Sequence, residues 1–201
     1  MYLNTYEFFE YAPKHPGLDY AFAMCVSGKP KVPIQVYRDE VLGNIDLTET
    51  IQRLTEKGII KEEGEGYVPI FLPESAFKGH CNGCAIYYDF LCDITRPRCR
   101  KNLGAVINFC KVFIVLCYLI DSGITEFSFR HIDFYLLGKG FERQGAVRGS
   151  PVTTVQAMWS STFKKILDMY AEAGIFSYEV KHGRGGGYSI KYGEKYLTKY
   201  Y

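Results

Sequence analysis

The most apolar stretch of the chain, residues 103–120, restricts the fold more than any other segment. Its eighteen residues approach the length of a membrane-spanning helix, yet Asn108 and Lys111 lie near its middle. An isolated membrane span between two soluble modules has little support. We therefore expect a helix that is buried at the centre of the fold or that forms one side of a homodimer interface, and no membrane contact.

The overall composition is that of a globular protein, with 47% hydrophobic and 23% charged residues in a chain of 201. This length suffices for one large domain or two small ones. The N-terminus lacks a basic stretch followed by an apolar one, so we expect a cytoplasmic protein. Asn and Gln number only five and four, and avoidance of these thermolabile amides is typical of a thermophile.

Charge is distributed unevenly along the chain. Residues 1–75 contain 7 Lys and Arg against 12 Asp and Glu, whereas residues 128–201 contain 11 against 6. An acidic half joined to a basic half predicts that one end meets a polyanion and the other end meets a different partner.

Residues 1–75 have the pattern of a small acidic domain. Short helices are expected within residues 3–28 and at about 36–42, and a clearer helix runs from near Asp46 to Gly58, a typical helix-ending residue. Residues 59–71 then read as strand, tight turn and strand. Helices followed by a β-hairpin resemble a winged helix-turn-helix. The turn and the last helix contain several glutamates that would repel phosphates, so we expect this domain to have a protein-contact or a purely structural role.

Residues 76–102 contain four cysteines, Cys81, Cys84, Cys92 and Cys99, with spacing C-x2-C-x7-C-x6-C. Asn-Gly lies between the first two, and glycine would let the backbone turn sharply and bring two thiolates to one metal. Tetrahedral thiolate coordination suits zinc or an iron-sulfur cluster, and the spacing does not decide between them. Disulfides or plain buried thiols are the alternative. The other three cysteines, Cys25, Cys110 and Cys117, are expected in the core.

Residues 103–201 repeat the order of elements in a basic domain. After the apolar helix, the pattern predicts a short strand at 124–128 and a long helix from about Thr153 to Ala173, ended by Gly174. Val155, Trp159, Phe163, Ile166 and Tyr170 form its core stripe. Strands are expected at 175–181 and 188–192, with a glycine-rich tip between them.

This second pattern resembles the winged helix-turn-helix superfamily of DNA-binding domains over residues 103–193. The resemblance implies that the long helix enters the major groove of DNA and that the glycine-rich tip, the wing, lies against the backbone or the minor groove. Arg184 with its neighbours would contact phosphate, and Gln156 suits a bond to adenine. The residues expected to bind double-stranded DNA are Thr154, Gln156, Ser160, Ser161, Lys164, Lys181, His182 and Arg184.

The combination with clustered cysteines is also similar to metal-cluster winged-helix transcription proteins such as the archaeal transcription factor E beta subunit, which implies an iron-sulfur cofactor. The sequence has no recognisable catalytic motif, so we do not expect an enzyme. The expected fold is α+β and mainly helical, with tandem winged-helix modules joined by a cysteine-rich metal-binding segment. The expected function is DNA-binding transcription regulation with a structural or redox-active metal site. The alternative is a protein-bridging or assembly factor in a transcription, replication or mobile-element complex.

Overall fold

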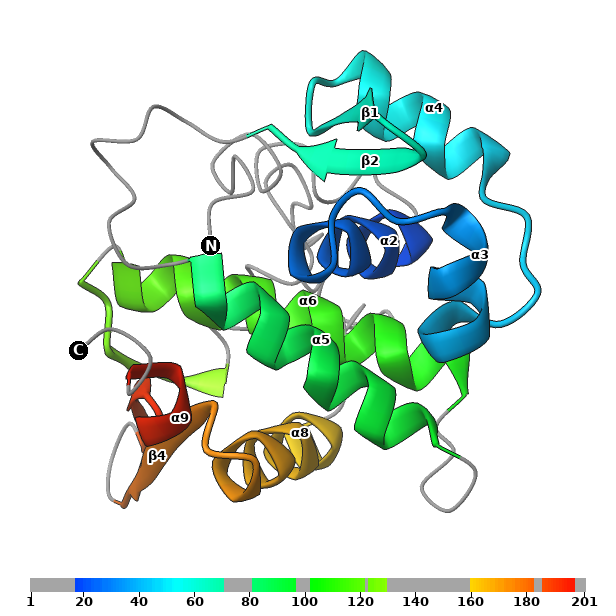
Figure 1. The fold of residues 1–201 in the computed structure, drawn as a ribbon. Coiled ribbons are helices and arrows are strands. Elements are labelled where there is room, and N and C mark those ends of the chain that lie inside the picture. The colour runs from blue at the N-terminus through cyan, green and yellow to red at the C-terminus, as the bar shows by residue number, and fades with distance from the viewer. Residues whose placement is uncertain are drawn as a thin grey trace, which may run out of the picture.

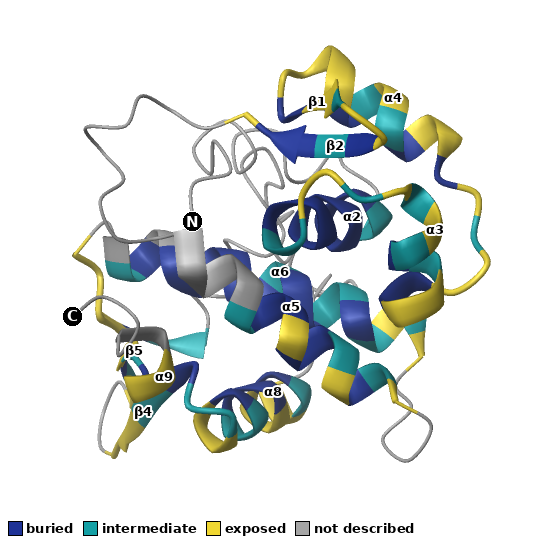
Figure 2. Cartoon of the chain, viewed as in Figure 1, coloured by how far each residue is buried: buried dark blue, intermediate teal, exposed yellow. Residues whose placement is uncertain are grey.

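Helix α6 (Leu103–Asp121) contains the apolar stretch and lies buried in the centre of the molecule (Figures 1 and 2). Its side chains from Val112 to Cys117 are each at most 2% exposed, which confirms the predicted central helix. No helix among the described residues is long and apolar enough to cross a membrane. The homodimer stays a prediction. The described apolar side chains of α6 pack within the core of a single chain.

The computed structural model describes residues 17–70, 81–96, 102–121, 123–129, 160–182 and 186–197. These residues form an α+β fold that is mainly helical, with two small antiparallel sheets, as predicted. The buried side chains of both halves belong to one continuous hydrophobic core. The predicted division into domains at residues 75 and 102 stays a prediction.

The first unit, residues 17–70, consists of a helical layer and a hairpin. Its elements are α2 (Gly17–Gly28), α3 (Ile34–Tyr37), the π-helix η2 (Arg38–Leu42), α4 (Thr48–Glu56), β1 (Ile60–Glu63) and β2 (Gly66–Pro69). The two strands pair antiparallel, with Glu63 opposite Gly66. The predicted hairpin and the predicted final helix are therefore confirmed, with inward-facing Leu47 and Leu54 both at most 1% exposed.

Helix α5 (Cys81–Thr95) packs beside α2. Its apolar residues Tyr87, Leu91 and Ile94 are buried, and this burial favours a continuous helix. The sharp turn expected at Cys81–Cys84 is not formed, because these residues begin α5.

The second unit, the described part of residues 103–197, begins with α6 and continues with β3 (Glu126–Phe127). It ends with α8 (Ser160–Glu172), β4 (Phe176–Lys181), β5 (Gly187–Tyr192) and α9 (Glu194–Leu197). Its sheet has the order β3-β5-β4, so the last strand lies between the first two. Phe163, Ile166 and Tyr170 of α8 are at most 3% exposed, which confirms the described part of the predicted core stripe.

Three helices end in the same hydrogen-bonded motif. After α4, Gly58 N–H donates to Thr55 and Ile59 N–H donates to Leu54; the ends of α6 and α8 repeat this pattern at Gly123-Ile124 and Gly174-Ile175. The three glycines have φ of 65°, 75° and 69°, values that disfavour side chains bearing a Cβ. The predicted helix ends at Gly58 and Gly174 are thus confirmed.

A second glycine position is also shared by the two units. Gly66 begins β2 and Gly187 begins β5. A Cβ at Gly66 would lie 2.1 Å from the carbonyl oxygen of Val32, and one at Gly187 would lie 2.4 Å from that of Phe127. In each unit, therefore, an earlier segment of the chain crosses so close to the last strand that only glycine fits there.

We expect Gly66→Ala and Gly187→Ala each to lower the free energy of unfolding by about 1–3 kcal/mol, because the clash is with backbone and cannot be relieved by a side-chain rotation. Denaturant unfolding measures the effect. Gly104→Ala is the matched control, since its Cβ would meet only the Asn102 side chain, at 3.5 Å. Equal stability of Gly187→Ala and Gly104→Ala would contradict the close crossing.

Candidate nucleic-acid interface

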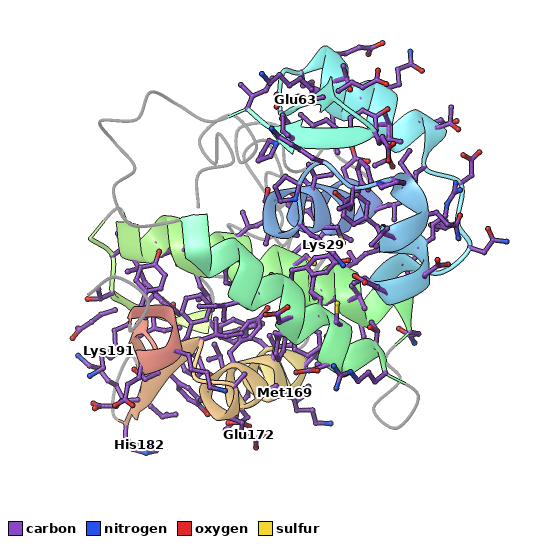
Figure 3. The ribbon with its side chains drawn as sticks, viewed as in Figure 1. Lys29, Glu63, Met169, Glu172, His182 and Lys191 are labelled. Carbon is purple, nitrogen blue, oxygen red and sulfur yellow. The ribbon has the colours of Figure 1, made fainter. Side chains whose placement is uncertain are left out.

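The candidate interface consists of the solvent-facing side of α8 and the distal end of the β4–β5 hairpin. Ser160, Ser161, Lys164, Lys181 and His182 are exposed there, so the described members of the predicted binding set are accessible. The three other predicted residues, Thr154, Gln156 and Arg184, lie outside the described residues. Figure 3 shows His182 at the end of β4, directed away from the core.

Lys164 is held by a carboxylate on its own helix. Its Nζ lies 2.9 and 3.1 Å from the two carboxylate oxygens of Asp168, one helical turn away, and 3.4 Å from the Tyr178 hydroxyl on β4. The Tyr178 hydroxyl also donates to Asp168. These bonds raise the pKa of Lys164, chiefly through Asp168, and lower that of Asp168, chiefly through Tyr178. The cation is therefore oriented and partly neutralised before any ligand arrives.

Lys181 is likewise paired, but with a residue distant in sequence. Its ammonium contacts the carboxylate of Glu126 on β3, although β3 and β4 are separated by β5. Lys181 lies opposite Gly187 in the sheet register, at the position where β3 approaches β5 most closely. Both partners are about half exposed, at 49% and 61%, so water screens this attraction strongly.

Sequence reasoning missed the acidic partners of both lysines. The i,i+4 spacing of Lys164 and Asp168 is a signal that could have found the first pair. No local signal links Lys181 to Glu126, because 55 residues separate them and only the sheet order brings them together. Lys191 of β5, also exposed and labelled in Figure 3, was missed as well.

The predicted metal ligands are only partly described. Cys81, Cys84 and Cys92 all lie on α5, and Cys99 lies outside the described residues. Cys81 and Cys84 are one helical turn apart, which suits two ligands of one site. Cys92, however, lies eight positions after Cys84 in a continuous helix, a rise of about 12 Å along the axis. This distance is too long for both thiolates to reach one zinc ion at about 2.3 Å. The four-cysteine site stays a prediction, and it would require α5 to unwind between them.

Cys92 instead borders a polar hollow of about 580 Å³ between the first unit and α5. Glu40 is the centre of this hollow: its carboxylate accepts from Lys29 Nζ at 2.7 and 2.8 Å and from the Tyr88 hydroxyl at 2.5 Å. Lys29 Nζ also lies 5.5 Å from the centre of the Tyr88 ring. Burial, followed by the charge of Glu40, raises the pKa of the Cys92 thiol. The contacts of Glu40 join η2 to α5 and to the residue that follows α2. Burial and the negative charge of Glu40 disfavour a reactive thiolate at Cys92.

The chain was compared with protein-family models, with curated proteins and with solved structures, and none of the three comparisons gave a match. The function must therefore be argued from the chain's own residues.

We expect Tyr178→Phe to raise the pKa of Asp168 towards its ordinary value of 3.8, because the variant lacks the largest cause of the lowered pKa. A carboxyl whose pKa is lowered by folding contributes stability above its unfolded pKa and loses it as pH falls through the folded pKa. The variant should therefore lose less stability in acid below about pH 4 than the wild type. Carboxyl ¹³C titration and unfolding at several pH values measure both effects.

Tyr188→Phe is the matched control, since this neighbouring tyrosine makes no hydroxyl bond to Asp168 in the described part of the chain. An Asp168 pKa that responds equally to both substitutions would contradict the proposed role of Tyr178.

Proposed function

We propose that the protein is a DNA-binding transcription regulator made of two winged-helix modules, and that its second unit binds double-stranded DNA. The observation that carries this proposal is the arrangement of the helix and the strands in that unit. A helix, α8, ends at Gly174 and leads into a hairpin whose last strand is flanked by β3, in the order β3-β5-β4. This is the arrangement expected of a winged helix, with the turn after Lys181 as its wing.

The shared features of the two units support the tandem arrangement. Each unit has a helix that ends in the same hydrogen-bonded motif, a hairpin, and a crossing segment packed against a glycine that begins the last strand. These shared features are the support for the tandem arrangement.

Charge supports assigning DNA to the second unit. Most of the basic excess of residues 128–201 comes from residues around the described elements, namely Arg130, Lys139, Arg143, Arg148, Arg184 and Lys199. In the sequence, these cations precede α8, fall between β4 and β5 or follow α9, and their binding to phosphates would release counterions. Thr154, Gln156, Ser160 and Ser161 would contribute hydrogen bonds to bases or phosphates.

The first unit is proposed to contact a protein partner. Four glutamates are exposed on α4 and on the β1–β2 hairpin that follows it, namely Glu49, Glu56, Glu62 and Glu65. Their negative charges disfavour binding of nucleic acid. A zinc ion or iron-sulfur cluster at Cys81 and Cys84, with Cys92 and Cys99 as the other predicted ligands, is retained as a proposal. Its binding would require α5 to unwind between Cys84 and Cys92, so metal binding and the local folding of α5 would be coupled.

A second candidate function is protein bridging without direct DNA binding. It is favoured by the ion pairs of Lys164 with Asp168 and of Lys181 with Glu126, since cations that are already paired attract a polyanion less strongly. This candidate predicts no DNA binding even at low salt.

Binding to a random-sequence duplex, measured by fluorescence anisotropy over a salt series, tests the proposal. We expect affinity to fall steeply with salt, and Arg184→Ala to reduce the slope of log K against log[salt] by about 0.9, because one phosphate contact is lost. Lys61→Ala is the matched control from the hairpin of the first unit, where the lysine is 59% exposed.

The control should leave both the affinity and the slope unchanged. Absence of binding by the wild type at low salt would reject the proposal and leave the bridging function. An equal effect of both substitutions would reject the assignment of DNA to the second unit.

A further inference from the structure

The two units contain the same ion pair at equivalent positions, with its charges exchanged. The equivalence follows from the glycine that begins the last strand of each hairpin. Glu63 lies opposite Gly66 in the first sheet, and Lys181 lies opposite Gly187 in the second. Val32 crosses Gly66 as Phe127 crosses Gly187. The residues just before these crossings, Lys31 and Glu126, are therefore also equivalent.

Each unit bridges these two positions with an ion pair across the glycine. In the first unit, Lys31 Nζ lies 2.5 Å from Glu63 Oε1. In the second unit, the Lys181 ammonium contacts Glu126. In the first unit, the anion is on the hairpin and the cation is on the crossing segment. In the second unit, the cation is on the hairpin and the anion is on the crossing segment.

The exchange agrees with the other charges of each hairpin. In the first unit, Glu62 and Glu65 are exposed beside Glu63, and Lys61 Nζ lies 3.3 Å from Glu63. In the second, His182 and Arg184 follow Lys181 in the sequence. Figure 3 places Glu63 and His182 at opposite ends of the molecule, so a duplex bound at one hairpin would not meet the other.

We infer that the direction of this ion pair, together with the other exposed charges of its hairpin, determines which hairpin accepts a polyanion. The pair joins the crossing segment to the hairpin whichever of the two residues is the cation. The packing of the unit therefore does not depend on which segment carries the positive charge. The residue on the hairpin strand is the one nearest the tip, and its charge is added to the field that an approaching phosphate meets. Lys181 and Glu126 are thus specificity-determining residues, and Lys31 and Glu63 are their excluding counterparts. This inference rests on the proposed function.

The test is the double variant Glu126→Lys/Lys181→Glu, which keeps the net charge and the ion pair but reverses its direction. We expect its affinity for random-sequence duplex DNA to fall about tenfold at 0.1 M salt, with a salt slope shallower by about one. Its melting temperature should stay within about 3 °C of the wild type, because an exposed pair contributes little to stability.

The matched control is Lys31→Glu/Glu63→Lys, the same reversal in the first unit. It should change DNA affinity by less than about twofold, because the exposed Glu62 and Glu65 still repel phosphates from that hairpin. Wild-type affinity in the second-unit variant, or an equal loss in the control, would overturn the inference while leaving DNA binding intact. A wild type that fails to bind DNA would overturn the proposed function and the inference together. A normal melting temperature in both variants shows that any loss is electrostatic.

Discussion

The fold depends on covering the apolar middle of α6, where the side chains from Val112 to Cys117 are at most 2% exposed. A helix without a polar face cannot lie on a surface, so other elements must surround it. Helices α2 and α5 pack against each other, α2 also packs on α6, and α8 and β5 approach α6 from the second unit. Elements of both units thus pack on α6. The burial of this one apolar helix therefore holds together an acidic first unit and a basic second unit.

Within this core, a few buried polar contacts fix the helix that each unit presents to solvent. Asp19 of α2 is fully buried and accepts bonds from Arg53 and Thr50 of α4. Tyr170 of α8 donates to the carbonyl of Phe109 in α6, and its hydroxyl lies 3.0 Å from that of Tyr87. Burial raises the pKa of Tyr170, so its hydroxyl keeps the proton that it donates. Hydrophobic packing alone would let these helices slide, whereas a buried hydrogen bond is lost unless the register is kept.

The features that sequence predicted well are those determined locally. Glycines that end helices, alternating hairpin strands and the apolar stretch each have a pattern within a few residues, and all three were found. The helical start of α5 was missed, because the spacing of Cys81 and Cys84 suits a turn as well as a helix and the decision lies in the burial of Tyr87 and Leu91. The Glu126–Lys181 and Glu40–Tyr88 contacts could not be predicted, since they depend on how elements distant in sequence meet.

The proposed division of function between the units is compatible with the features that they share, because different forces govern stability and phosphate recognition. Stability comes from buried apolar area and from backbone crossings that require glycine, and neither changes when an exposed charge is exchanged. Phosphate recognition, in contrast, depends almost entirely on exposed charge. Two units that share these helix ends and glycine crossings could therefore carry opposite hairpin charges without loss of packing. A pair such as Lys31–Glu63 or Glu126–Lys181 is well placed to differ, because its attraction is the same in both directions while the surface that it presents is opposite.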